Sequence, residues 1–169
     1  WGGLIFKSND LDIGWDGTNL RSDYNNFNEE DFLKDEPNLK ARHFLHYYHI
    51  NKMIVNYHLK QYDVAHKAMK LSEKYLSDSG GMQHVVWHHL YKGLIAIALN
   101  QKTGSTKYSS QLKKADKFLS KLKKFNSEVY GNLSDLLALE LNKSNKKGSV
   151  LCDDYDALIE KLKSEQSIQ

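Results

Sequence analysis

Apolar residues recur at spacings of three and four along most of the chain beyond about residue 39. This spacing is typical of helices that bury one face and expose the other. It predicts six helices, over residues 39–59, 62–77, 82–100, 109–125, 127–143 and 150–164. Short polar or glycine-containing segments separate most neighbouring helices, which favours successive helices that pack on one another. The sequence therefore predicts an all-α fold of three antiparallel helical hairpins.

The beginning of the chain follows a different pattern. It is rich in Gly, Asn and Asp, which supply turns, and residues 4–6 form a short apolar segment that favours a strand. Asn28 is placed to cap a short helix that includes Leu33, because acidic residues follow it and would face the positive end of the helix dipole. Ser77 to Gly81 is a second turn-rich segment, whose glycines can adopt the left-handed conformation that ends a helix.

Charge divides the chain at nearly the same place as the apolar pattern. Residues 1–39 carry a net charge of −6, whereas residues 40–169 carry a net charge of +9. We therefore predict an acidic, irregular leader over residues 1–38 and a helical array over residues 39–169.

One stretch of the array, residues 56–65, matches the centre of a tetratricopeptide-type repeat. In such repeats, aromatic and small residues at fixed positions let two helices pack closely. Tyr62 stands at the aromatic position and Ala65 at the small position where the helices cross, whereas Lys60 replaces the usual turn glycine. A less regular unit with the same layout spans residues 140–159. This resemblance implies a TPR-like α-solenoid.

A longer resemblance uses five segments, residues 27–33, 44–48, 62–65, 73–76 and 136–141, together with Lys52 and Tyr57. With these segments, residues 29–165 resemble the helical-repeat part of large multidomain signalling proteins. Those proteins also carry a Ser/Thr-kinase-like region, a STAND-type ATPase and histidine-kinase modules. The resemblance implies a signal-relay module that senses a ligand or docks a partner and has no activity of its own.

The first 18 residues support an alternative. Residues 1–6, 8–10 and 14–18 are similar to the middle of the β-sandwich sorting domain at the C-terminus of secreted Bacteroidetes proteins. The Pro-x-Gly-x-Tyr strand expected soon afterwards is absent. A fragment of a secreted bacterial protein is therefore the alternative origin, and a chain that begins at Trp1 is expected to be processed or excised.

Composition favours a soluble cytoplasmic protein with no membrane partner. The longest uncharged apolar run, residues 93–99, is too short to span a bilayer. The single cysteine, Cys152, cannot form an internal disulfide, which fits a reducing compartment.

Eight histidines raise the question of a metal site. His84 and His88 are four residues apart, the spacing at which two imidazoles on one helix can hold a metal ion. No Glu follows His84, as a metalloprotease of this type would need. A metal-binding sensor that uses His84 and His88 is thus an alternative function, while seam and surface positions are the simpler interpretation of the histidines.

A lysine row marks the helix predicted over residues 109–125. Lys113, Lys117, Lys121 and Lys124 share one face and are joined by Lys114 and Lys123. Such a row can attract an acidic partner, and the absence of arginine near it disfavours nucleic acid. The residues expected to contact a protein or peptide partner are His43, His46, Tyr47 (or Tyr48), Trp87, His88, Tyr91, Lys113, Lys117 and Lys121.

Catalytic motifs are not found in the sequence. There is no Gly-x-Ser-x-Gly elbow and no glycine-rich phosphate loop. Cys152 stands beside two aspartates, which would raise its pKa and suppress the thiolate. The predicted function is therefore a non-catalytic interaction or sensing module without a cofactor.

Overall fold

The chain forms two compact units, Trp1–Val85 and Val86–Gln169, in the computed structural model. The structure describes residues 13–15, 20–22, 27–28, 33–34, 42–143 and 149–166. The division between the units falls three residues into helix α4 (Gln83–Thr103). The change in charge near residue 39 therefore does not coincide with the division into compact units.

The described part of the leader contains a small antiparallel sheet. Strands β1 (Ile13–Trp15), β2 (Leu20–Ser22) and β3 (Phe27–Asn28) pair in the order β1-β2-β3. Asn28, the predicted helix cap, lies opposite Arg21 at the end of this sheet. Leu33 and Lys34 are helical, as predicted for the short helix that includes Leu33, and the residues between Asn28 and Leu33 lie outside the described part of the chain. Strands of two or three residues are too short to produce a detectable alternating pattern, which is why the sequence predicts only turns here. The strand predicted at residues 4–6 lies outside the described residues.

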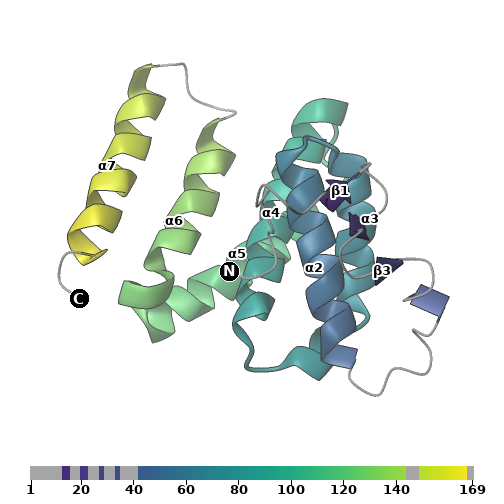
Figure 1. Cartoon of the computed structure of the whole chain (residues 1–169). Coiled ribbons are helices and arrows are strands. Elements are labelled where there is room, and N and C mark those ends of the chain that lie inside the picture. The colour runs from purple at the N-terminus through teal and green to yellow at the C-terminus, as the bar shows by residue number, and fades with distance from the viewer. Residues whose placement is uncertain are drawn as a thin grey trace. The chain divides into compact units, whose positions relative to one another are not determined.

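Helices α2 (Arg42–His58) and α3 (Tyr62–Glu73) pack on one another in the first unit (Figure 1). The buried apolar side chains on this pair include Leu45, Ile50, Met53, Ala65, Ala68 and Met69. In the turn between the helices, Lys60 has a φ angle of 60°, a left-handed conformation that favours glycine. The lysine therefore occupies the position where the repeat pattern expects a glycine.

Helix α3 ends at Glu73, four residues before the predicted end. The chain then tightens into the 3₁₀ helix η2 (Leu76–Ser79), which packs against α2. The guanidinium of Arg42 lies 5.2 Å from the ring centroid of Tyr75, just before η2. Gly81 has a φ angle of 79°, which confirms the predicted left-handed glycine after this segment.

The second unit contains most of α4 and the helices α5 (Ser109–Phe125), α6 (Ser127–Lys143) and α7 (Ser149–Gln166). The bounds of α5 and α6 are those predicted, and each end of α4 and α7 lies within three residues of its predicted position. Helix α6 packs against both α5 and α7 (Figure 1).

A single residue, Asn126, connects α5 to α6. Its backbone N–H donates to the carbonyl oxygen of Leu122, 2.9 Å away, at the end of α5. Its side-chain Oδ1 accepts a hydrogen bond from the backbone N–H of Val129, 3.1 Å away, in the first turn of α6. Asn126 thus satisfies backbone groups at the ends of two helices.

Helix α4 lies close to α5 and α6 at Gly93. A Cβ atom built on Gly93 would lie 2.7 Å from Cδ1 of Leu137 on α6 and 3.2 Å from Cβ of Ala115 on α5. Both neighbouring side chains are buried. A side chain at position 93 would therefore require the buried Leu137 side chain to shift, so Gly93 allows this close approach.

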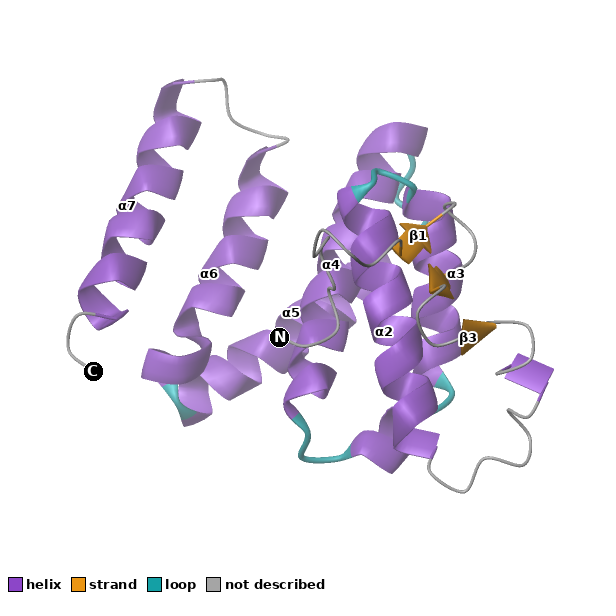
Figure 2. Cartoon of the chain, viewed as in Figure 1, coloured by secondary structure: helices purple, strands orange, loops and turns teal. Residues whose placement is uncertain are grey.

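The all-α prediction is confirmed for the described residues from Arg42 onward, which form helices and the short turns between them (Figure 2). The described strands all belong to the leader. Among the described helices, none is both long enough and apolar enough to cross a membrane.

Candidate interaction surface

An aromatic patch lies on α2 and the first residues of α4, within the first unit. We define it as His43, Phe44, Tyr47 and His84. Phe44 is 59% exposed and Tyr47 is 41% exposed, while His43 and His84 are half-buried. The rings of His43 and Phe44 lie 4.3 Å apart, and Phe44 and Tyr47 are three residues apart on one helix face.

His84 joins this patch to the interior of the first unit. Its ring centroid lies 5.0 Å from that of His46 and 5.6 Å from that of Tyr47, which it meets edge-on. Nε2 of His84 is buried without a hydrogen-bond partner in the part of the chain that the structure describes. Burial lowers the pKa of His84 below its ordinary value of 6.5, and the charge of nearby His43 lowers it further. His84 is therefore held in its neutral form.

We expect acidification to destabilise the first unit through His84. The unfolded chain binds a proton near pH 6.5, whereas the folded chain resists protonation to a lower pH. The contribution of His84 to the free energy of unfolding is therefore complete above pH 6.5 and is lost as the pH falls from 6.5 to the lowered pKa. Urea denaturation at pH 7.5 and pH 5.5 should show that His84→Gln loses less stability on acidification than the wild type.

The matched control for this measurement is His58→Gln. His58 is an exposed histidine at the end of α2, so this substitution removes one imidazole from the first unit without opening a buried site. An equal loss of stability in the wild type and in His84→Gln would contradict the assignment.

Two of the predicted contact residues are not surface residues. His46 and His88 are both fully buried, so the prediction that they are exposed contacts is wrong. His46 lies on the side of α2 that also carries Leu45 and the other buried residues. The apolar pattern could not distinguish buried from exposed histidines, because histidine is found both between packed helices and on surfaces.

The other predicted residues on α4 are partly accessible. Trp87 and Tyr91 are both half-buried, and burial raises the pKa of Tyr91 above its ordinary value of 10.0. Both expose a smaller fraction of their surface than Phe44, an apolar residue of a helix whose apolar positions are expected to be buried. Sequence analysis therefore missed Phe44, although its neighbours His43 and Tyr47 are polar enough to indicate an outer face.

The two histidines proposed as a metal site, His84 and His88, lie in different environments. His88 is buried, while the ring of His84 is directed at His46 and Tyr47. Among the described residues, no group of three or more His, Cys, Asp or Glu side chains is arranged to hold a metal ion.

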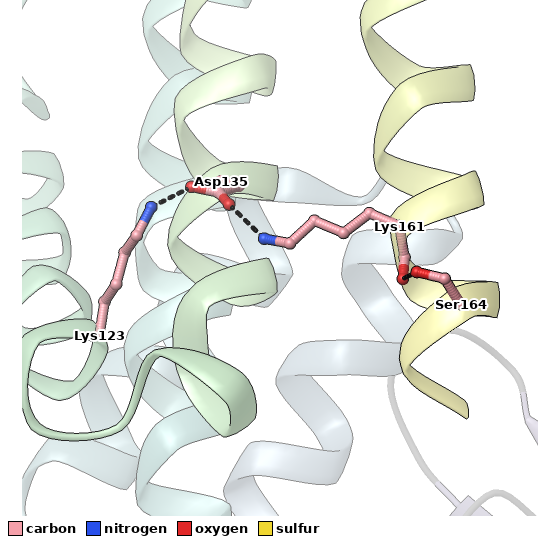
Figure 3. Close-up of polar contacts among 4 residues, drawn as sticks. All are labelled: Lys123, Asp135, Lys161 and Ser164. Atoms are coloured by element: carbon pink, nitrogen blue, oxygen red, sulfur yellow. Dashed lines mark hydrogen bonds and ion pairs between the residues drawn. The ribbon is translucent and has the colours of Figure 1, made fainter. Parts of the chain in front are cut away.

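The lysine row on α5 is largely exposed, with one exception. Lys113, Lys117 and Lys121 are exposed, as are Lys114 and Lys124. Lys123 instead turns to α6, where its Nζ lies 2.5 Å from Oδ1 of Asp135 (Figure 3). The other carboxylate oxygen of Asp135 lies 3.3 Å from Nζ of Lys161 on α7 (Figure 3). One carboxylate thus links three successive helices.

The environment of Asp135 shows that this link is an ionic one. Burial by itself would raise the pKa of Asp135, but the hydrogen bonds and charges of Lys123 and Lys161 outweigh it, so the pKa lies below its ordinary value. The carboxylate is therefore charged near neutral pH. Across the described ranges, Lys123 thus differs from the other lysines of α5 in that its ammonium group is paired with a carboxylate of the second unit.

The aromatic patch presents aromatic and imidazole rings, and the lysine row on α5 presents ammonium groups. These groups suit recognition by stacking, apolar contact and charge. Searches of protein-family models, curated proteins and solved structures find no match to this chain.

Proposed function

We propose that this chain is a non-catalytic helical-repeat module that binds a protein or peptide partner within a cytoplasmic signalling protein. The observation that carries the proposal is the aromatic patch. Its two exposed rings, Phe44 and Tyr47, are neighbours on a helix whose opposite side is packed on α3. Exposed aromatic side chains on a rigid scaffold are frequent anchors at protein interfaces.

Helix pairing supports the repeat part of the proposal. The α2–α3 unit has a short turn with a left-handed residue at Lys60 and a fully buried small residue at Ala65. The rings of Tyr57 and Tyr62 lie 5.7 Å apart across the turn. These features match the layout of a tetratricopeptide unit, and we propose that successive helices stack as antiparallel hairpins in a TPR-like solenoid. The resemblance of residues 29–165 to signalling proteins supports the same role.

Site-specific photo-crosslinking tests the proposal. We would replace Tyr47 by p-benzoylphenylalanine in the full chain, irradiate its native cells and identify covalent adducts by mass spectrometry. A partner that uses the patch should form an adduct at this position. Its yield should fall roughly fivefold or more when Phe44→Ala is added, because loss of an anchor residue typically costs more than about 1 kcal/mol of binding free energy.

The control places the same crosslinker at Lys67, an exposed position on α3. Adducts there should be different and insensitive to Phe44→Ala. If position 47 yields no adduct, or yields one that Phe44→Ala leaves unchanged, the aromatic patch is not a binding surface.

A further inference from the structure

We propose that the accessible side of α5 binds an acidic polypeptide segment. We define the lysine face as Lys113, Lys114, Lys117, Lys121 and Lys124. This inference rests on the proposed function, since it names a partner chemistry for an interaction module, but it concerns a surface of the second unit. The aromatic patch belongs to the first unit.

The five ammonium groups of the lysine face gather on one side of the helix. At about 100° of rotation per residue, their Cα positions fall within a sector of about 100°. The buried residues Ala115 and Leu119 lie on the opposite side of α5. From Lys113 to Lys124 the row is about 16 Å long, at about 1.5 Å per residue. This length matches about five residues of an extended peptide or three turns of a helix.

No acidic side chain neutralises the lysine face within the described part of the chain. Its five lysines are exposed and form no ion pair there. Asp116 is the one acidic residue of α5, and it lies outside the sector. Lysines three or four residues apart on a helix repel one another and destabilise it. A partner that brings carboxylates to this face would remove that repulsion as it binds.

The charge on α5 is also not arranged to stabilise the helix itself. Its first turn has no acidic residue, and the row begins at Lys113, close to the positive end of the helix dipole. Only Lys123 and Lys124 are in the last turn, where a positive charge is favourable, and Lys123 is already paired with Asp135. The dipole therefore does not account for the other four lysines.

An acidic polypeptide fits this face better than a nucleic acid does. Neither arginine of the chain, Arg21 or Arg42, lies on α5, so the lysines of this face are not accompanied on their own helix by the planar forks that hold phosphates in two-point contacts. Directly after the face, Phe125 is 85% exposed and Val129 is 59% exposed. A nucleic-acid duplex, whose bases are already stacked and paired, presents only its charged backbone here and would not cover them, whereas a peptide with acidic residues and one apolar side chain would. The expected partner is therefore acidic and amphipathic.

The test uses two labelled probes and two charge-reversed variants of the full chain. The first probe is a peptide of about 16 residues that repeats Glu-Glu-Leu, and the second is a DNA duplex of random sequence. Binding is followed by fluorescence anisotropy at low and at physiological salt. Lys113→Glu, Lys117→Glu and Lys121→Glu are combined in one variant. The control combines Lys60→Glu, Lys67→Glu and Lys74→Glu, which are exposed lysines at and beyond the α2–α3 turn.

We expect the peptide to bind the wild type and the control alike, and to bind the face variant at least roughly tenfold more weakly. Both variants change the net charge equally, so equal losses would mean non-specific attraction and would overturn the proposal. If the duplex binds more tightly than the peptide and the face variant loses this binding, the lysine face binds nucleic acid and the proposal is overturned. Failure of the wild type to bind the peptide at physiological salt would also overturn the proposal. Crosslinking at Tyr47 is independent of each outcome, so failure of the lysine face and failure of the proposed function are distinguishable.

Discussion

Gly93→Val should lower the free energy of unfolding by about 3 kcal/mol. The new Cβ would lie 2.7 Å from Cδ1 of Leu137, and the two added methyl groups would lie against the same packed region. Leu137 is only 1% exposed, so its side chain has little room to move away. Overpacking of this kind typically costs about 1–3 kcal/mol, and the better helix propensity of valine offsets only a few tenths of that. Urea denaturation followed by circular dichroism measures the change.

Gly131→Ala is the matched control for this prediction. Gly131 is also a buried glycine inside a helix, α6, but a Cβ there would meet only Nζ of Lys161, at 3.9 Å. Alanine should fit without strain and stabilise the chain by about 0.5–1 kcal/mol, because glycine is a poor helix former. The two substitutions should therefore shift stability in opposite directions. A neutral Gly93→Val would mean that α4 does not approach α5 and α6 as closely as the structure indicates.

Leu119→Ala should be about equally damaging, through a cavity and not through a clash. Leu119 is fully buried on the inner side of α5. Truncation of a buried leucine typically costs about 2–5 kcal/mol, and the cost is higher where neighbouring groups cannot collapse into the space. The same denaturation experiment should show a loss of about 3 kcal/mol.

Phe125→Ala supplies the comparison on the same helix. This larger side chain is 85% exposed, so its removal should change stability by less than about 0.5 kcal/mol. Comparable losses for the two variants would show that α5 does not bury the face that contains Leu119. A stable Phe125→Ala protein is also suitable for testing whether this side chain contributes to binding of an acidic peptide.

The helices could be predicted from the sequence because their signals are local. Helix α5 has apolar residues only on one side, and its bounds agree with the prediction at both Ser109 and Phe125. The end of α3 was harder to place, since the segment after Glu73 continues the helical pattern in tighter 3₁₀ form. The sheet at β1–β3 was missed because its strands have only two or three residues, and alternation is a reliable signal only over about four or more.

The surfaces could be predicted only in part. Exposure of the lysines follows from their charge, because an unpaired ammonium group is costly to bury. Histidines and aromatic residues carry no such restriction, so the sequence could not show that His46 is buried while Phe44 is exposed. Their positions depend on which side of α2 meets α3, and the apolar pattern of α2 is interrupted by polar residues on several sides. Asp135 was missed as well, since its role requires lysines from two other helices.

The one-residue connection at Asn126 has a consequence for the orientation of the lysine face. A longer loop would let α5 rotate about its own axis without disturbing α6. Here the same residue ends one helix and caps the next, so a rotation by one residue, about 100°, would break hydrogen bonds at both ends. The direction in which the ammonium groups of the lysine face point is thereby fixed relative to α6. A partner would meet these charges already oriented, and little rotational entropy of the helix would be lost on binding.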